Sequence, residues 1–475
     1  MFSASSLHLV RRTTYGPTPA LLTEIGSLGA AKWLDRQLAP QTIDDSACDK
    51  LLARYPALDW SIPTTRAKLN NSGGWDAMFQ VVRATLTRAL WSKRQLFEVM
   101  VEFWSNHLNV TCPSSDVWDN RADYDRVIRE HALGSFDDLL VEASLHPAMQ
   151  RYLDNASSNK WHPNENQGRE LLELHTVGVG AGYGEDDVKN SARILTGVTV
   201  GNDGTALYKP AWHWTGPVQV LGFTHQNADA AGGLDVAKAY LRYLARHEST
   251  AAQLARKLAV RFVSDDPSPG LVERLAQTYL DHDTAIVPVL RELFSSSEFK
   301  AAAGQKVRRP YEDVVATVRV LGLKADKAGT QGVEALHWML AGMGHAPLAW
   351  APPNGYPDVA AAWSSPAGSL ARWNAHLNIG ARWWPGKNML NGAGAMSLMP
   401  AKLPATHGAF VDGLALRLLN RRATAGEKAA VCAFLTDQWN KVTPGTRVTR
   451  KSAIVTWRLP YVVALLLDTP EHALR

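Results

Sequence analysis

The sequence predicts a mainly α-helical protein, a large multi-helix single body with a small inserted β-ribbon. Apolar residues recur at spacings of three and four through most of the 475 residues, which is typical of amphipathic helices. Hydrophobic residues make up 46% of the chain and charged residues 20%, so the chain can bury a large core and is not expected to be disordered. Strand-like alternation is predicted at residues 206–222 (ALYKPAWHWTGPVQVLG), which also hold a Thr-Gly-Pro turn.

Helices are expected in order along the chain. Residues 19–38 predict two short helices split near Gly26, with Thr18 as the N-cap. Residues 75–108 predict one long helix or two abutting ones. Further helices are predicted over residues 123–133, 136–145, 147–154, 165–177, 186–195, 250–263, 268–281, 284–295, 309–322, 331–343, 366–380, 408–420, 424–440 and 451–467. Residues 345–361 are rich in Pro and Gly and predict a long ordered loop.

Three regions are predicted from weak boundaries in the pattern. Residues 1–200 form an N-terminal helical region, residues 201–232 the β-ribbon insertion, and residues 233–475 a C-terminal helical region packed on the first. Because no internal repeat or low-complexity segment separates them, we expect one body instead of independent modules.

Charge and cysteine content argue against several classes of protein. The net charge of +5 is small for this length, and no Lys/Arg-rich block supplies the basic surface that nucleic-acid binding requires. The three cysteines are far apart and lack Cys-x-x-Cys spacing, which argues against a disulfide scaffold or a cysteine zinc site. No apolar window predicts a membrane span, and the first residues lack the apolar stretch of a signal peptide. We therefore expect a cytoplasmic protein by default, with export alongside a partner as the alternative.

One motif, NENQGRELLELHTVGVGAGYG (residues 164–184), concentrates charged side chains on a short helix. Asn164 is predicted as its N-cap, and Glu165 lies in the first turn, where the helix dipole favours a carboxylate. At helical spacing one polar stripe carries Asn166, Arg169, Glu170 and Glu173. His175 falls on the opposite, apolar face, and a run of glycines ends the helix.

The polar stripe has two interpretations. If it lines a cleft, Glu170 and Glu173 are close enough to couple as an acid/base pair, with Arg169 orienting them. If it faces water, the same residues form a solvated surface with an Arg–Glu ion pair. Glu170 and His175 face opposite ways, so they cannot chelate one ion from a straight helix, and the HExxH spacing is absent.

His107, in FEVMVEFWSNHLNV, is a second histidine on an apolar helix face. Together with His175 it predicts a shared polar pocket or a site for a divalent transition metal such as zinc or iron. A metal would need a third ligand, for which His131, His146 and Asp154 are candidates. The alternative is that both histidines are core residues with satisfied hydrogen bonds.

Tryptophan is abundant, with 17 copies, and several stand beside Pro and Gly. Trp212 and Trp214, in AWHWTGP, are predicted to line a cleft, because indoles combine a flat apolar face with a polar N–H and suit planar ligands such as sugar rings. Asn166 and Tyr356 are predicted as further substrate contacts. The alternative is that the tryptophans fill the core of a helical protein.

Several stretches resemble a known family and cover nearly the whole chain in order. They are HLVRRTTYGPTP, EFWSNHLNV, RVIREHALGSFDDLL, HPAMQRYLDN, NENQGRELLELHTVGVGAGYGEDDV, ARILTG, ARKLAVRFVSDDP and PPNGYPDVAAAW. The chain is similar to the bacterial family catalogued as domain of unknown function 1800. The resemblance implies a mainly helical fold and no particular activity. The chain departs from the family's His-Asp-x-Gly-x-Lys pattern at His213, where Trp214 follows, so the resemblance assigns no acid–base couple there.

The resemblance also implies a protein partner. Members of this family often occur beside a second family, domain of unknown function 1501, which resembles alkaline phosphatases and sulfatases. A protein of that second family is therefore the partner that the resemblance suggests.

Two functional hypotheses follow. The first is an enzyme, such as a hydrolase, that uses a carboxylate/histidine site, with a metal if a third ligand joins, on a glycan-like or polymeric substrate. Its catalytic residues would be Glu165, Arg169, Glu170 and Glu173, and its metal ligands His107 and His175. The second hypothesis is a non-catalytic helical partner or escort of a phosphatase- or sulfatase-like protein.

Overall fold

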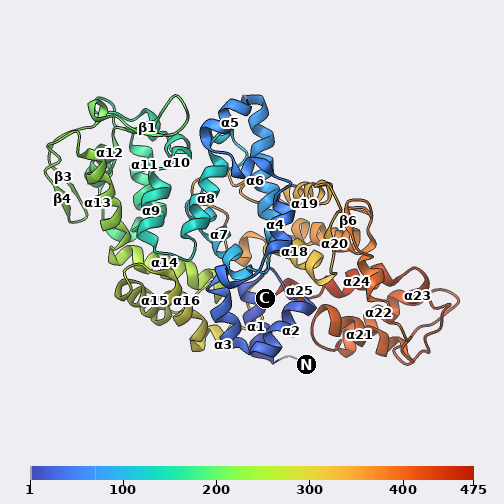
Figure 1. The fold of residues 1–475 in the computed structure, drawn as a ribbon. Helices are drawn as coiled ribbons and strands as arrows, with labels where there is room; N and C mark the ends of the chain where they lie inside the picture. Colours follow the sequence, from blue (N-terminus) through green and yellow to red (C-terminus); the bar gives the residue numbers. More distant parts are fainter. Residues whose placement is uncertain (1–2, 70) are drawn as a thin grey trace.

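The fold is mainly α-helical, as the sequence predicts. The computed structural model describes residues 3–69 and 71–475. Helices form nearly all of its regular structure, and these residues contain three small two-stranded antiparallel sheets (Figure 1).

The part of the chain before the first strand is helical. Its helices are α1 (Ala4–Thr13), α2 (Pro19–Leu28), α3 (Ala30–Gln37), α4 (Ser46–Leu52), α5 (Ile62–Lys68), α6 (Asn71–Trp91), α7 (Gln95–His107), α8 (Arg121–His131), α9 (Phe136–Leu145), α10 (Pro147–Tyr152), α11 (Glu165–Glu170) and α12 (Glu185–Leu195). A π-helix, Leu171–His175, continues α11 directly. Short 3₁₀ helices occupy Pro40–Thr42, Pro56–Asp59, Ser115–Val117, Asn155–Ser157 and Val179–Ala181.

The predicted ribbon over residues 206–222 is two ribbons. β1 (Val198–Val200) pairs with β2 (Ala206–Tyr208), and β3 (Val218–Val220) pairs with β4 (Phe223–His225). The Thr-Gly-Pro segment, in which Gly216 has φ +134°, separates the two ribbons instead of turning one. The second ribbon turns at Leu221 and Gly222, both with positive φ. The partner strands, β1 and β4, therefore lie outside the predicted range of residues 206–222.

The rest of the chain is again helical. Its helices are α13 (Gly233–Ala245), α14 (Glu248–Phe262), α15 (Pro269–Asp281), α16 (Ile286–Ser295), α17 (Ser297–Ala301), α18 (Pro310–Val320), α19 (Gln331–Gly342), α20 (Pro366–Ala381), α21 (His407–Leu418), α22 (Ala425–Leu435), α23 (Ala453–Thr456), α24 (Leu459–Leu467) and α25 (Pro470–Ala473). Two-residue strands β5 (Lys324–Ala325) and β6 (Leu390–Asn391) pair with each other, and 3₁₀ helices lie at Pro210–Trp212, Ala360–Ala362 and Gly394–Leu398.

Two predicted helix boundaries move for identifiable reasons. The break between α2 and α3 falls at Gly29, not Gly26, because Gly29 adopts φ +79° and its N–H closes α2 on Ile25. Residues 75–108 form two helices, α6 and α7. The carboxylate of Asp45 accepts the backbone N–H of Lys93 between them, at 2.8 Å, and so satisfies a donor that the broken helix leaves free.

One hydrophobic core extends through the molecule, from Leu9 in α1 to Leu467 in α24. Figure 1 shows α9–α13 with β1–β4 at one end and α21–α23 at the opposite end, while α7, α14 and α18 lie between them. Trp33 and Trp104 are fully buried in the core, whereas some other tryptophans, such as Trp161 and Trp439, are exposed. Across residues 3–69 and 71–475, every helix is too short or too polar to cross a lipid bilayer.

Candidate functional site

The charged motif helix begins as predicted and then changes its winding. Asn164 is the N-cap, and its side chain accepts the backbone N–H of Asn166 at 2.9 Å. After Glu170 the α-helix gives way to a π-helix, which ends at His175. Because a π-helix bonds each residue to the fifth one along, residues beyond Glu170 rotate away from their straight-helix positions. Short π-helical segments of this kind are frequent at functional sites.

Gly178 lets α14 close onto this π-helix. It has φ +83°, and a Cβ placed on it would lie 1.9 Å from Oε1 of Gln253. Gln253, in α14, donates in turn to the carbonyl oxygen of Leu174 at 3.1 Å. The left-handed φ is what favours glycine here, because the Oε1 that a Cβ would meet is the mobile end of the Gln253 side chain.

A cavity of about 410 Å³ opens beside the π-helix, within the size range of small-molecule sites. Its walls come from α7, the π-helix, α14, the segment before α18 and the Pro/Gly-rich loop predicted over residues 345–361. The lining residues are Glu102, Phe103, Asn106, His107, Glu173, Leu174, Val179, Gln253, Arg256, Lys257, Val260, Arg261, Arg309, Asn354, Tyr356 and Asp358. Of the ten site residues predicted from sequence, this lining includes His107, Glu173 and Tyr356.

His107 is held at both ring nitrogens. Nε2 lies 3.0 Å from the carbonyl oxygen of His175, and Nδ1 lies 2.9 Å from Nζ of Lys257. A carbonyl can only accept, so Nε2 carries the proton and Nδ1 accepts from Lys257. Burial, followed by the charge of Lys257, keeps the pKa of His107 well below its ordinary value. His107 is therefore a neutral imidazole of fixed tautomer.

His175 lies near His107 but does not face its ring nitrogens directly. The two rings lie 6.3 Å apart between centroids, and both nitrogens of His107 already have protein partners. Nε2 of His175 is buried without a hydrogen-bond partner among the described residues. Burial, then Lys257, lowers the pKa of His175 to about 3. The contact that joins the two residues runs from Nε2 of His107 to the backbone carbonyl of His175.

Lys257 is the group that sequence analysis missed. Besides His107, its Nζ contacts the carbonyl oxygen of Leu174 at 3.1 Å. Burial lowers the pKa of Lys257 to about 8. A lysine in this range is suited to act as a base or an amine nucleophile, because a useful fraction is neutral near neutral pH. The sequence signal that could have indicated this site is the pair Lys257 and Arg261, two cations four residues apart in the largely apolar helix segment ARKLAVRF.

A buried ion-pair network forms one wall of the cavity. Arg309 Nη2 lies 2.9 Å from Glu102, and Arg261 lies 3.4 Å from both Glu102 and Asp358. Glu312 accepts from the backbone N–H of Arg309 at 2.9 Å and pairs closely with Arg261. Burial alone raises the pKa of Glu312, but Arg261 and its neighbours hold it well below the usual range. The network therefore fixes both cationic and anionic groups at this wall.

The Pro/Gly-rich loop is clamped to α7 by an amide pair. Nδ2 of Asn106 donates to the carbonyl of Tyr356 at 2.8 Å, and the backbone N–H of Tyr356 donates to Oδ1 of Asn106 at 2.6 Å. Gly355 has φ +69°, and a Cβ there would lie 2.1 Å from the backbone oxygen of Asn106. The predicted substrate contact Tyr356 thus reaches the cavity because glycine permits this approach.

The remaining residues of the polar stripe lie outside the cavity lining. Arg169 forms ion pairs with Glu185 at 2.7 Å and Glu165 at 3.4 Å, and it lies 4.0 Å from Glu173. Burial and the neighbouring Glu173 raise the pKa of Glu170. The fourth stripe residue, Asn166, is exposed. The stripe therefore divides, with Glu173 turned to the cavity and the others on the surface side.

The ribbon tryptophans are also placed away from the cavity. Trp212 lies under the ammonium of Lys209, 4.0 Å from the ring centroid, and Trp214 lies under the guanidinium of Arg193 at 4.7 Å. His213 between them is buried, with Nε2 2.9 Å from the side-chain oxygen of Asn227. Each of these cation–π contacts occupies one face of its indole.

The three candidate third ligands lie elsewhere. His146 caps α10 and lies 3.0 Å from Asp123. Asp154 is exposed at a residue with φ +62°, and His131 is partly buried at the end of α8. Within the described ranges, the residues close enough to share a metal ion are Asp313, His376 and His472, a group that sequence analysis did not single out.

Comparison with known proteins places the chain in a family. No curated protein and no solved structure matches it significantly. A family profile with the description "Protein of unknown function (DUF1800)" matches residues 8–474, nearly the whole chain, as the motif resemblance predicts. The chain is therefore a member of the DUF1800 family.

Proposed function

We propose that this protein is an enzyme that performs acid–base chemistry with Lys257 and His107 in the cavity. The observation that carries the proposal is the contact between Lys257 Nζ and His107 Nδ1, at 2.9 Å, on the cavity wall. Lowered lysine pKa values in a polar cavity are typical of catalytic groups. In Lys257 the cause is burial.

The hydrogen bonds of Lys257 favour its use as a base. With a pKa of about 8, about a tenth of the amine is neutral at pH 7. A neutral amine has two N–H donors, and the carbonyl of Leu174 and Nδ1 of His107 provide two acceptors for them. The lone pair then remains free for the proton of a bound hydroxyl or water. Glu173, on the same cavity, is the proposed proton donor to the leaving oxygen.

The lining supports a hydroxyl-rich, glycan-like ligand. Carboxylates accept hydrogen bonds, guanidinium groups donate them, and the amides of Asn106, Gln253 and Asn354 do both. Sugar hydroxyls also both donate and accept, so such a surface matches them better than it matches a purely anionic ligand. Phe103 and Tyr356 add aromatic rings to the wall. The proposed substrate class therefore depends on the cavity and no longer on the ribbon tryptophans.

Competitive acetylation tests the state of Lys257. The intact protein is treated with trace acetic anhydride between pH 6 and 11, and each lysine's labelling is quantified by mass spectrometry. We expect the reactivity of Lys257 to titrate with a midpoint near pH 8, because burial disfavours its charged form. Exposed Lys189 in the same digest is the internal reference. Identical pH profiles for the two lysines would refute the proposal.

Ligand binding tests the substrate class. Neutral and acidic oligosaccharides are screened against the full chain by ligand-observed NMR, followed by assays for cleavage of any binder. Lys257→Met should abolish turnover, while Lys189→Met on the exposed face of α12 should leave it unchanged. If the wild-type protein binds an oligosaccharide but cleaves none of its binders, the catalytic role is contradicted.

A second candidate function, a partner protein, is favoured by an exposed aromatic patch. Trp383, Phe434 and Trp457 surround Tyr461 at centroid distances of 6.0 to 6.1 Å. Trp383 and Trp457 are each 56% exposed, and exposed aromatic clusters are typical of protein interfaces. The proposed partner is a protein of the domain of unknown function 1501 family. Co-purification that is lost in Trp457→Ala but kept in Lys257→Met would support this role.

A further inference from the structure

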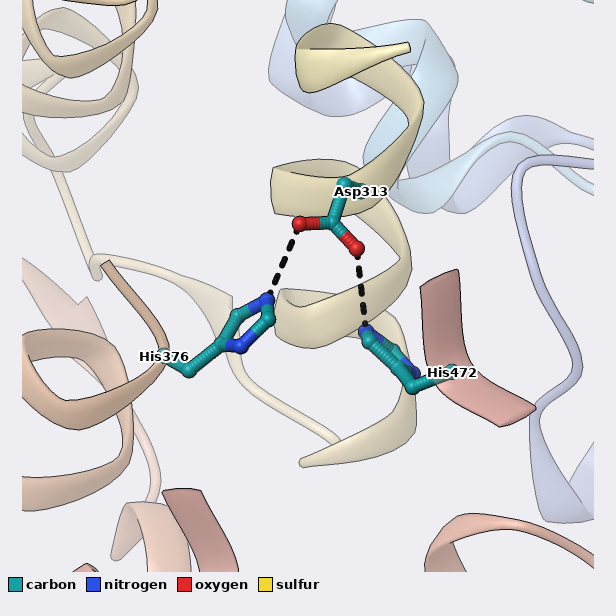
Figure 2. A group of neighbouring side chains, drawn as sticks. All are labelled: Asp313, His376 and His472. Carbon is teal, nitrogen blue, oxygen red and sulfur yellow. Dashed lines mark hydrogen bonds and ion pairs between the residues drawn. The ribbon is translucent and has the colours of Figure 1, made fainter. Parts of the chain in front are cut away.

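We propose that Asp313, His376 and His472 bind a divalent transition-metal ion of the zinc class. Figure 2 shows the carboxylate of Asp313, on α18, between the two imidazoles, which come from α20 and α25. One ligand atom from each residue lies within 4.8 Å of the others. All three side chains are buried. Two imidazoles and one carboxylate are a common ligand set for zinc.

The distances suit tetrahedral coordination. Asp313 Oδ2 lies 3.0 Å from His376 Nε2, and Asp313 Oδ1 lies 3.5 Å from His472 Nε2. Ligand bonds of about 2.0 Å at tetrahedral angles separate two ligand atoms by roughly 3.3 Å. Both separations lie near that value but involve different oxygens of Asp313, so an ion that takes both imidazoles requires small side-chain movements. Thr317 Oγ1 lies 3.0 Å from His472 Nε2 and donates to the backbone oxygen of Asp313 at 2.9 Å.

A second carboxylate already orients His376. Asp468 Oδ1 lies 2.7 Å from Nδ1 of His376, on the side of the ring away from Asp313. Metal-binding histidines usually donate their second N–H to such a carboxylate, which fixes the tautomer and strengthens the ligand. Asp468 is therefore proposed as a positioning residue for the metal ligand His376.

One buried atom of the group has no hydrogen-bond partner. Asp313 Oδ1 lacks one among the described residues, although it points toward His472. Without an ion, His376 hydrogen-bonds to Asp313 and Asp468, and Oδ1 of Asp313 has no hydrogen-bond donor. Buried carboxylate oxygens rarely lack a partner, because leaving them unpaired is energetically unfavourable. A cation bound between Asp313 and His472 removes that cost. This unpartnered oxygen, aimed into the group, is the observation that favours a metal over a simple ion pair.

The site would be structural. The ligands are buried and come from three helices, which favours a zinc ion that joins elements over one that binds substrate. The three ligands tie together α18, α20 and α25, which are far apart in the sequence. Because the argument uses no cavity residue, the outcome of the Lys257 labelling experiment does not bear on it.

Metal analysis of the full chain tests the proposal. Protein from zinc-supplemented culture should contain about one equivalent of a first-row divalent metal per chain, as a structural site retains its ion through purification. His376→Gln and His472→Gln should lose it. His146→Gln is the matched control, because His146 is also buried and lies 3.0 Å from a carboxylate, Asp123. Equal metal loss in the control would overturn the assignment.

Cobalt substitution covers the case in which a ligand variant fails to fold. Metal-stripped wild-type protein titrated with Co²⁺ should give the intense visible absorption of a tetrahedral site, saturating at one equivalent. Asp468→Asn keeps all three ligands and should weaken Co²⁺ binding by about 10- to 100-fold. Wild-type protein without bound metal, and without a saturable cobalt spectrum, would overturn the proposal.

Discussion

Nζ of Lys257 lies 2.9 Å from Nδ1 of His107, whose other ring nitrogen contacts the carbonyl oxygen of His175. This chain of contacts joins α14, α7 and the π-helix at one wall of the cavity. It gives the histidine one tautomer and gives the lysine an acceptor. These contacts are the basis of the proton-transfer role proposed for Lys257 and His107.

The first prediction concerns stability and pH. The folded-state pKa of Lys257, about 8, lies below the unfolded value of about 10.4. Between these values the unfolded chain binds more protons, so the contribution of Lys257 to the free energy of unfolding rises as pH rises from 8 to 10 and is unfavourable below 8. The wild-type value relative to Lys257→Met should therefore increase by roughly 3 kcal/mol between pH 7 and 10.5.

Urea unfolding at a series of pH values measures this difference. Lys189→Met, which removes an exposed lysine from α12, should give a curve parallel to that of the wild type. If Lys257→Met is also parallel to the wild type, the lysine is not desolvated in solution.

The second prediction separates two carboxylates of the same motif. Glu173 lines the cavity, whereas Glu170 lies outside its lining. Glu173→Gln should lower kcat on an oligosaccharide substrate by about 100-fold or more, the usual loss for a general acid. Glu170→Gln, which also removes one negative charge from this segment, should change kcat by less than about threefold. If steady-state assays show equal decreases in kcat for the two variants, the effect comes from removing a negative charge and not from the position of Glu173 in the cavity.

The third prediction concerns the loop clamp at Gly355. Gly344 and Gly355 have similar φ values, +72° and +69°, but an added Cβ at Gly344 meets nothing within 4 Å. Gly344→Ala should cost about 1 kcal/mol for its left-handed backbone. Gly355→Ala should cost at least about 2 kcal/mol more, because its Cβ meets the backbone oxygen of Asn106. Equilibrium denaturation measures the free energy of unfolding of both variants. Equal decreases would show that the loop moves to accommodate the added Cβ at Gly355.

The fourth prediction concerns the buried network. Glu312 accepts a hydrogen bond from the backbone N–H of Arg309 and forms ion pairs with Arg475 and Arg261. Glu312→Gln should destabilise the protein by about 3–5 kcal/mol, because it leaves buried guanidinium groups uncompensated. Glu298→Gln, in the surface pair with Arg274, should cost less than about 1 kcal/mol.

The pH dependence of the same variant adds a check. The folded-state pKa of Glu312 is depressed, so its stabilisation is present above the ordinary glutamate range and is lost as pH falls below it. The wild type should therefore approach the stability of Glu312→Gln in acid. A constant gap between the two at all pH values would contradict the ion-pair role.

Sequence patterning determined the helices and their caps. The apolar spacing of three and four predicts most of the helical segments, because each helix must bury one face. Thr18 and Asn164 are N-caps as predicted, since a cap needs only a local hydrogen bond to its own first turn. The family motifs likewise predicted the match over residues 8–474.

Tertiary structure alone decided the site. Glu173 enters the cavity and Glu170 does not because a π-helix, invisible to regular helical spacing, intervenes after Glu170. Lys257 meets His107 across 150 residues of sequence, and Asp313, His376 and His472 converge from three separate helices. Local patterns report which face of a helix is apolar. They do not report which distant helix covers it, because that choice is made by packing the whole core.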